Sequence, residues 1–483
     1  MSYESIRAED MIHNLFGGVE SKQKHHLYKV YACSFQKDYH CSFEAYDQEA
    51  ICIDIPAAIS GPWTKEIEKK GIFLSDKEAC LDESASSVHL LIGADIAGAT
   101  LNHLLDGAPD CYKMTAHQLQ KSMYVDNCVA SVKSEADLTK FINESREIMA
   151  LGKFELRGWQ HNSFESLRDN CKESQNASHI LQDIPVLGLL WNIERDTLKI
   201  DVRNDTQSES VKVTKRYILS KCHKIFEPIG ITAPITLIPK ILLQETWKIK
   251  ANWDDILPEE IAHKFEKWDR QLHQLNKLEI PRWIQGHKNS KHSLHVFCDA
   301  NQQAYATCIF FKICEPTRSY LSFSSSKITS STSKKYFHFR LELLGCCIGL
   351  RLAKTICTDL EEHGGIPAYY WSDSMNCLYW IKNDEQWATF VMNRVKEIRS
   401  GSEPLQWNYV PGNLNPADLP SRGCSVNTLI TRRWWEGPAW LTEEEELWPI
   451  SNLYPDKNVV NAEKKKKKSV VTSCLCQITL GNS

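Results

Sequence analysis

The chain contains 483 residues, of which 42% are hydrophobic and 24% are charged, so it has the composition of a globular protein with room for about two to four domains. Its formal net charge of −4 excludes a general attraction to nucleic acid, and any such binding requires local basic patches. No apolar run approaches the ~18 residues of a membrane-spanning helix, so we expect no membrane partner.

Residues 1–106 are predicted to form short strands separated by polar turns. The segment CSFEAYDQEAICIDI is rich in β-forming residues, and the apolar run VHLLIGADIAG, which Gly93 interrupts, is typical of a buried strand. The composition changes at LLDGAPDCYKM, where Gly107 and Pro109 predict a turn and a domain boundary. We therefore expect a β-rich first segment that ends near residue 106.

Residues 107–185 are predicted to contain a helix, a short strand around KSMYVDNCVASV and a charged helix, SEADLTKFINESREIMALG, that ends at Gly152. The next segment, 186–290, mixes the strands VLGLLWNI and TLKIDV with the helices SKCHKIFEPIG and EEIAHKFEKWDRQLHQLNKL. Residues 291–425 predict three β-runs, a long helix, a fourth β-run, a further helix and a loop rich in Pro, Asn and Gly. The fold class is therefore a multidomain mixture of α/β and α+β parts.

Four acidic residues of the 291–425 segment follow a regular order. Asp299 comes where a strand ends, and Glu342 lies beside the apolar stripe of the long helix. Asp373 follows an aromatic strand, and Asp418 comes just after Pro416, at a plausible first turn of a helix. Adjacent strand ends and a helix packed across the sheet can bring such side chains together.

A convergent set of carboxylates predicts metal-dependent phosphodiester chemistry. Two divalent ions roughly 3.5–4 Å apart activate a water and stabilise the leaving oxygen in phosphodiester cleavage. Mg²⁺ prefers hard oxygen ligands, so this chemistry needs several carboxylates from a rigid scaffold. Each acid alone is more often an ordinary solvated side chain, because the chain has 61 Asp and Glu. The order and the β-β-β-α-β-α setting together favour a metal site.

The segments FCDA, RLELLG, WSDSMNCLYWI and NPADLPSRG resemble the ribonuclease H segment of the Pol polyprotein of Pao/BEL-type LTR retrotransposons. This resemblance implies a mixed sheet flanked by helices, two Mg²⁺ ions that Mn²⁺ can replace, and the RNA strand of an RNA–DNA hybrid as substrate. It makes Asp299, Glu342, Asp373 and Asp418 the four metal-binding carboxylates. Cellular ribonucleases H carry a histidine in the loop before Asp418 that is thought to assist product release, and VPGNLNPAD lacks it. This difference affects the expected rate of turnover more than the expected cleavage reaction.

The segment KSMYVDNCVAS resembles the palm hairpin of a reverse transcriptase, in which Tyr-x-Asp-Asp presents two acids. Here Tyr124 and Asp126 are followed by Asn127, so an amide replaces one carboxylate. Too few residues separate LLIGADIAG from YVDN to supply fingers and the other half of a palm. The resemblance therefore implies a truncated palm remnant over 107–185, and we predict no polymerase activity.

Other segments fit the same family. The run FEPIGITAPITLIPKILLQETWK and the strand VLGLLWN imply a thumb and connection over 186–290, a stretch commonly labelled a Pao retrotransposon peptidase. Residues 1–106 resemble the later part of a retropepsin-like protease, with LLIGAD near the end of that fold. The catalytic tripeptides Asp-Thr-Gly and Asp-Ser-Gly occur nowhere in the chain, so we predict no peptidase activity.

The tail, 426–483, is rich in Trp and then in Lys. The run KKKKK at 464–468 is either a solvated tail or a nucleic-acid or nuclear-import signal. The 18 cysteines are scattered and the N-terminus lacks the apolar core of a signal peptide, so we expect reduced thiols and an intracellular protein, cytoplasmic with access to the nucleus. The tail contains four tryptophans that either stack on bases or pack against the preceding domain: Trp434, Trp435, Trp440 and Trp448.

Lysines and an arginine form two further basic stretches that could contact the phosphates of a hybrid, although exposed lysines are ordinary on helices and loops. The residues are Lys212, Lys215, Arg216, Lys221, Lys224, Lys327, Lys334 and Lys335.

Three hypotheses follow from the sequence. The first is a Mg²⁺-dependent endoribonuclease in which Asp299 and Asp373 hold both ions, Glu342 ligates one and orients water, and Asp418 completes the second site. The second is a non-catalytic retroelement remnant with at most weak nucleic-acid binding, which is favoured by the internal deletion that the missing fingers and half palm imply. The third, an aspartic peptidase, rests on the family label alone.

Overall fold

The structure, a computed structural model, divides the chain into two compact units, Met1–Gln160 and His161–Ser483. Each unit is considered by itself. The described residues are 5–15, 19–33, 40–47, 94–124, 127–152, 154–162, 183–202, 212–225, 228–284, 290–316, 318–330, 338–360, 365–450 and 453–465. No helix within these residues is long and apolar enough to cross a membrane.

The first unit contains an antiparallel sheet of β1 (Ser5–Leu15), β2 (Val19–Cys33) and β3 (His40–Tyr46). It also contains α2 (Ala94–Asp106), α3 (Lys113–Ser122), α4 (Glu135–Leu151) and the hairpin of β4 (Met123–Tyr124) and β5 (Asn127–Cys128). The predicted charged helix is confirmed as α4: Ser134 Oγ accepts a hydrogen bond from the Asp137 N–H, and Gly152 ends the helix.

The prediction of a strand over VHLLIGADIAG is wrong for its last residues. Its first part, 88–93, lies outside the described residues, whereas Ala94 begins α2. The physical reason lies downstream, where Leu101, Leu104 and Leu105 follow helical spacing and Leu105 is buried in a cluster with residues of α3 and α4. The amphipathic helical pattern that follows the apolar run therefore determines the structure of its last residues, which form the first turns of α2.

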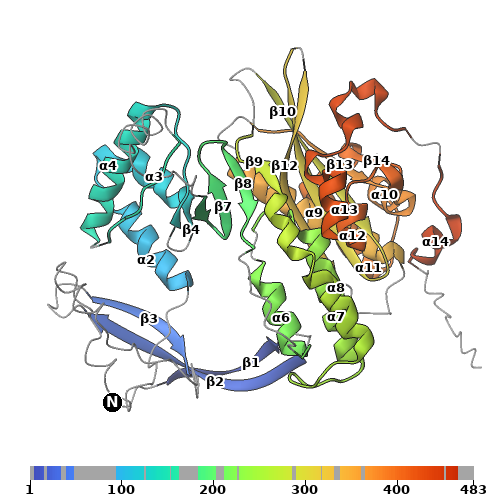
Figure 1. The fold of residues 1–483 in the computed structure, drawn as a ribbon, viewed down its shortest axis with the longest axis horizontal. Coiled ribbons are helices and arrows are strands. Elements are labelled where there is room, and N and C mark those ends of the chain that lie inside the picture. Colours follow the sequence, from blue (N-terminus) through green and yellow to red (C-terminus); the bar gives the residue numbers. More distant parts are fainter. Residues whose placement is uncertain are drawn as a thin grey trace, which may run out of the picture. The chain divides into compact units, whose positions relative to one another are not determined.

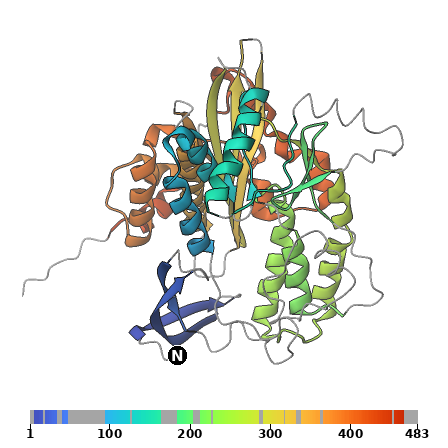
Figure 2. The same ribbon diagram turned by 90° about the vertical axis from the view of Figure 1, so that its left-hand side faces the viewer.

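The second unit begins with a small antiparallel sheet whose fourth strand comes from much later in the chain. Its strands are β6 (Ile184–Val186), β7 (Leu189–Asn192), β8 (Thr197–Ile200) and β9 (Glu279–Pro281), in that order. Between β8 and β9 come α6 (Lys215–Lys224), α7 (Ala233–Lys248) and α8 (Glu259–Asp269), with α7 packed against both of the others (Figures 1 and 2).

Helix α7 was not predicted, because Pro234 and Pro239 are typical helix breakers. Pro234 lies in the first turn, where its missing N–H costs nothing. Pro239 lies inside the helix and cannot donate a hydrogen bond to the carbonyl of Ile235, four residues earlier. The indole N–H of Trp268, on α8, donates to that carbonyl at 3.0 Å instead. The tertiary contact thus satisfies the group that the proline leaves unpaired.

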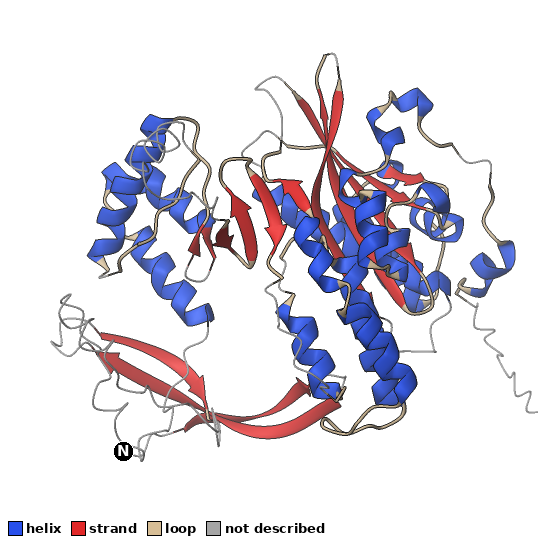
Figure 3. Ribbon diagram, in the orientation of Figure 1, coloured by secondary structure: helices blue, strands red, loops and turns tan. Residues whose placement is uncertain are grey.

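The main sheet has five strands, drawn at the centre of the unit in Figure 3. Their order is β12 (Ser319–Ser330), β11 (Ala304–Cys314), β10 (Lys291–Ala300), β13 (Ala368–Ser372) and β14 (Trp407–Tyr409). The first three are antiparallel neighbours, whereas β10–β13 and β13–β14 are parallel pairs. The three predicted β-runs, the long helix α9 (His338–Asp359) and the fourth β-run are confirmed.

Helices cover both faces of this sheet. Alternate residues of β10 point to opposite faces: Leu294 and Val296 join a core with α9 and with α11 (Thr389–Gly401), whereas Phe297 joins a core with α7 and α8. Because both faces are covered, residues 294–300 of β10 and nearly all of β11 are buried, whether their side chains are apolar or polar. Helix α11 and the short strand β14 were not separately predicted.

The Trp-rich tail packs against the same domain, as one of its two readings predicted. Trp434 is buried, and its indole N–H donates to Pro416 O at 2.8 Å. Trp440 and Trp448 contact Trp371 of β13 edge-on, with ring centroids 5.1 and 5.4 Å away. The tail therefore contacts the loop that precedes Asp418 and covers part of the face of the sheet that carries Trp371.

His295 is buried among these aromatic rings. It stacks on Tyr369 at 5.0 Å, its Nδ1 accepts from the Trp371 indole N–H at 3.3 Å, and its Nε2 lies 2.9 Å from Ser293 Oγ. Burial, followed by the charge of Lys312, lowers the pKa of His295 to about 3. The imidazole is therefore neutral with its proton on Nε2, since a second proton on Nδ1 would face the indole N–H.

This environment makes a pH-dependent contribution to stability. The pKa of His295 is lowered in the folded protein, so the unfolded state binds more protons below the ordinary pKa of 6.5 and stability is lost as pH falls from there towards 3. We expect wild type to lose about 2 kcal/mol relative to His295→Gln between pH 7 and pH 5, measured by urea unfolding. The glutamine keeps a donor and an acceptor but does not titrate. A stability difference that stays constant with pH would contradict the assignment.

Candidate metal centre

Two of the candidate acids are brought together by the register of the parallel strands. Cys298 of β10 pairs with Ser372 of β13, so the next residues, Asp299 and Asp373, emerge at the same end of the sheet. This is the convergence that the strand-end pattern predicted. Helix α9 supplies Glu342, and one carboxylate oxygen from each of the three residues lies within 4.8 Å of the others.

Small residues on α9 allow the helix to approach the sheet closely. A Cβ atom on Gly345 would lie 3.3 Å from the backbone oxygen of Asp299. A Cβ atom on Gly349 would lie only 2.6 Å from Cys298 Sγ, closer than real contacts allow. The two glycines lie three and seven residues after Glu342, on the same side of the helix, so they set how far its carboxylate reaches over the strand ends.

Two of the three carboxylates are buried, that of Asp373 is half-buried, and their hydrogen bonding is incomplete. Asp299 and Glu342 are each 3% exposed. Within the described part of the chain, Glu342 Oε2 and Asp373 Oδ1 are buried and have no hydrogen-bond partner. Burial, and then the charge of Asp373, raises the pKa of Asp299 to about 7 and that of Glu342 well above its usual range. Burial also raises the pKa of Asp373.

This arrangement fits a hard divalent cation. Buried carboxylates that face one another repel when ionised, and they require a positive charge among them to stay ionised at neutral pH. The donors are all oxygen atoms, which Mg²⁺ and Mn²⁺ prefer over softer ligands. Two of the oxygens have no partner among the described residues, and unpartnered buried acceptors are rare in folded proteins unless an ion or water satisfies them.

The fourth candidate, Asp418, lies beside this group rather than in it. It is the first residue of the short helix α12 (Asp418–Arg422), and its Oδ1 accepts a hydrogen bond from Arg422 Nε one turn later. Its charge nevertheless contributes to the raised pKa of Asp299 and of Asp373. The structure thus brings three of the four predicted acids together and places the fourth nearby, partly neutralised by an arginine.

Three further side chains support the acids and were not predicted. Ser421 Oγ, on α12, donates to Asp299 Oδ2, and Asn415 Nδ2, in the loop before α12, donates to Cys298 O at 3.0 Å. Both hydrogen bonds connect this part of the chain to the end of β10. His338 Nε2 lies 3.4 Å from Glu342 Oε1. The His338–Glu342 spacing of four residues on a helix could have revealed that pair. No sequence signal connects Ser421 with Asp299, because 122 residues separate them.

Lys215 and Arg216, two residues of the predicted basic stretches, are engaged by other groups of the protein. Lys215 is 1% exposed, and its Nζ donates to Ala251 O at 2.7 Å and lies 3.5 Å from the ring centre of Trp247. Arg216 forms a bidentate pair with Asp254. Lys334 and Lys335 lie outside the described residues. Of the residues that could contact the phosphates of a hybrid, Lys215 is therefore excluded by its burial, and Arg216 is engaged by Asp254.

The polymerase-like hairpin is present as two very short strands. Tyr124 of β4 pairs with Asn127 of β5, as expected for a tight hairpin. Asp126, the remaining acid of the motif, lies outside the described residues.

Comparison with known proteins identifies the type of domain. Residues 214–374 match the sequence model of a family described as the Pao retrotransposon-like RNaseH-like domain. No curated protein matches the chain. The matched range contains Asp299, Glu342 and Asp373 but ends before Asp418. The chain therefore carries an RNase H-like domain of retrotransposon type, and the peptidase hypothesis loses the family label on which it rested.

The chain is also similar to solved structures. The chain is similar to the N-terminal RNase H domain of Rv2228c from Mycobacterium tuberculosis, solved as a fusion with maltose binding protein, at 10% identity and a TM-score of 0.20, covering 30% of this chain and 99% of that one. It is also similar to the foamy viral protease-reverse transcriptase in complex with dsDNA, at 14% identity and a TM-score of 0.18. That second match covers 66% of this chain and 58% of the other.

Proposed function

We propose that the protein is a metal-dependent endoribonuclease that cleaves the RNA strand of RNA–DNA hybrids. The observation that carries the proposal is the group formed by the buried carboxylates of Asp299 and Glu342 and the half-buried carboxylate of Asp373, with one oxygen from each within 4.8 Å of the others. The RNase H-like family match over 214–374 supports the same reaction class. The choice of hybrid as substrate rests on the resemblance to retroelement ribonuclease H segments.

Each acid takes a separate part in this proposal. Asp299 and Asp373, at neighbouring strand ends, would hold two Mg²⁺ ions between them, and Glu342 would ligate one of the ions and orient the attacking water. Bound Mg²⁺ lowers the pKa of that water and stabilises charge on the leaving oxygen. Ser421 fixes the carboxylate of Asp299 by its hydrogen bond. Asp418 would complete the second metal site from α12.

The remaining segments are proposed to be inactive remnants. Residues 1–106 would derive from a retropepsin-like protease, 107–185 from a reverse-transcriptase palm, and 186–290 from its thumb and connection. Asn127 in place of an acid argues against polymerase chemistry, and the lack of Asp-Thr-Gly and Asp-Ser-Gly argues against proteolysis.

One observation favours the alternative of a non-catalytic remnant that binds nucleic acid weakly. The carboxylate of Asp418 is engaged by Arg422, so the fourth ligand is not directed freely towards the other three. The two candidates differ in whether a metal ion produces cleavage.

Metal removal is the direct test of the proposal. The purified full-length protein is incubated with a hybrid whose RNA strand is end-labelled, in Mg²⁺, in Mn²⁺ and in EDTA. Because two ions supply the water activation and the charge stabilisation, we expect internal cleavage in either metal and none in EDTA. Single-stranded RNA of the same sequence is the control for contaminating ribonucleases. No cleavage in any metal, with binding of the hybrid retained, would favour the non-catalytic remnant.

A further inference from the structure

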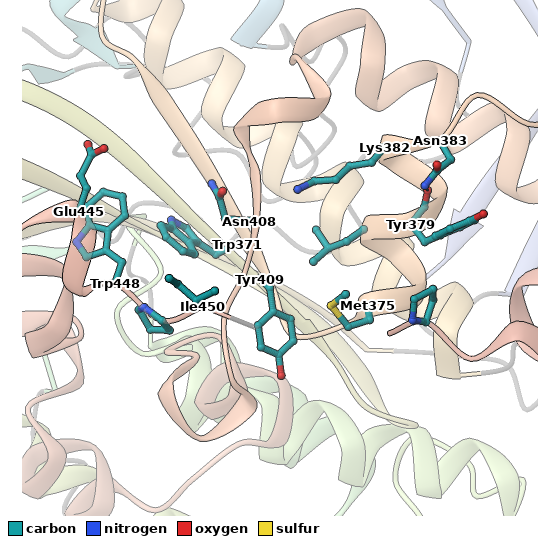
Figure 4. Close-up of a pocket in the computed structure, with 13 residues that line it drawn as sticks. Trp371, Met375, Tyr379, Lys382, Asn383, Asn408, Tyr409, Glu445, Trp448 and Ile450 are labelled. Atoms are coloured by element: carbon teal, nitrogen blue, oxygen red, sulfur yellow. The ribbon is translucent and has the colours of Figure 1, made fainter. Parts of the chain in front are cut away.

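A cavity of about 460 Å³ lies at β14, the edge strand of the main sheet (Figure 4). On one side it is lined by α10 (Met375–Lys382), and on the other by the tail segment that contains Trp448 and Ile450. Trp371 and Tyr409, from the two parallel strands β13 and β14, form its inner wall. We refer to it as the β14 cavity.

The β14 cavity begins next to the carboxylate group. Asp373 lies in the chain between Trp371 and Met375, which both line the cavity. Tyr409 pairs in register with Ser372, the residue before Asp373. A strand whose phosphodiester lies on the carboxylates would therefore have a neighbouring nucleotide close to the cavity.

The walls combine aromatic faces with a few polar groups. Tyr379, Tyr409 and Trp448 present rings, and Met375 and Ile450 add apolar contact. This combination of an apolar lining with few polar groups is typical of sites for small planar ligands.

The polar groups can serve a nucleotide. Asn383 Nδ2 donates to Tyr379 O at 2.9 Å, and Asn408 Nδ2 donates to Gln406 O at 3.0 Å. These hydrogen bonds fix the orientation of both side-chain amides, and the amide oxygens can accept hydrogen bonds from a ligand. Lys382 has no carboxylate partner within the described part of the chain, and burial alone lowers its pKa. A cation of this kind favours an anionic ligand over an uncharged apolar one.

We propose that the β14 cavity binds one unpaired nucleotide of the strand whose phosphodiester lies on the carboxylates, with its base against Tyr409 and Trp448 and a phosphate at Lys382. The inference rests on the proposed function and adds a specificity to it. The cavity has room for a single nucleotide and not for a base-paired duplex, so it selects hybrids that end in a single-stranded overhang. Base stacking on aromatic side chains tolerates any sequence.

Binding of overhang and blunt hybrids tests the inference. Two hybrids of equal length are compared with the full-length protein, one blunt and one with a two-nucleotide RNA overhang that carries 2-aminopurine. Affinity is measured in EDTA, where no cleavage competes. One stacked base contributes about 1–3 kcal/mol, so we expect about 5- to 150-fold tighter binding of the overhang hybrid and a change in 2-aminopurine fluorescence.

Three variants locate the site. Lys382→Met and Ile450→Glu are expected to remove the preference for the overhang, because they delete the cation and add a negative charge at the cavity. Leu405→Glu is the matched control: Leu405 is 89% exposed, more than Ile450 at 84%, and does not line the cavity. Equal affinity of wild type for both hybrids, or an unchanged preference in Lys382→Met and Ile450→Glu, would overturn the inference. Cleavage of the blunt hybrid in Mg²⁺ is recorded separately, so that failure of the cavity and failure of the nuclease are distinguished.

Discussion

Asp299→Asn is expected to reduce metal-dependent hybrid cleavage by roughly 10²–10³-fold or more, the loss that follows removal of one preorganised electrostatic group in other active sites. Asp299 is 3% exposed and lies within 4.8 Å of both other acids of the group. The amide keeps the shape of the side chain and can still accept the hydrogen bond of Ser421. The variant therefore removes one negative charge while leaving the surrounding contacts in place. Initial cleavage rates in Mg²⁺ measure the effect.

The stability of the same variant separates loss of chemistry from loss of fold. The pKa of Asp299 is raised to about 7 in the folded protein, so without metal the folded state holds its proton more tightly than the unfolded state does. Stability without metal therefore falls as pH rises from about 4 to 7. In EDTA at pH 8, Asp299→Asn is expected to be more stable than wild type, by urea unfolding.

A matched control is available in the same domain. The side chain of Asp384 is 98% exposed and pairs only loosely with Arg399, at 3.4 Å. Asp384→Asn also removes one negative charge, and it is expected to leave cleavage and stability within about 0.5 kcal/mol of wild type. Full activity in Asp299→Asn, or an equal loss in Asp384→Asn, would rule out the carboxylate group as the active centre.

The sequence predicts the positions of Asp299 and Asp373, which depend on the order of the strands. It is less informative about the position of Asp418, which depends on a loop. Asp299 and Asp373 each follow a strand, and parallel neighbours place such residues at one end of the sheet. The position of Asp418 instead depends on contacts across the fold, such as Asn415 with Cys298 O. Those contacts join residues more than a hundred positions apart, and no local pattern encodes them.

The predictions of secondary structure failed where tertiary contacts reverse a local preference. Helix α7 contains Pro239, and the indole of Trp268 satisfies the carbonyl that this proline leaves unpaired. Likewise, a lysine in a basic stretch predicts an exposed charge, yet Lys215 is buried against Trp247. In each case the deciding partner is a tryptophan on another element, which a window of neighbouring residues does not include.

Gly349→Ala is expected to destabilise the second unit by about 1–3 kcal/mol, the usual cost of overpacking a core. Alanine favours a helix over glycine by roughly 0.5–1 kcal/mol, so the overlap must outweigh this gain. The added Cβ would lie 2.6 Å from Cys298 Sγ, 3.0 Å from Val296 Cγ1 and 3.1 Å from Thr307 Oγ1. Moving α9 away relieves the overlap but carries Glu342 away from the strand ends. Cleavage is therefore expected to fall together with the free energy of unfolding.

Two further variants test whether the overlap with the sheet is the cause. At Gly98, in the interior of α2, nothing lies within 4 Å of an added Cβ, so Gly98→Ala is expected to gain the roughly 0.5–1 kcal/mol of helix preference. Cys298→Ala removes the nearest overlapping atom, and the Gly349→Ala/Cys298→Ala double variant is expected to recover part of the loss, seen as a favourable interaction energy in a double-mutant cycle. Strict additivity of the two substitutions would show that α9 does not depend on this contact for its position, and the placement of Glu342 would then need another physical cause.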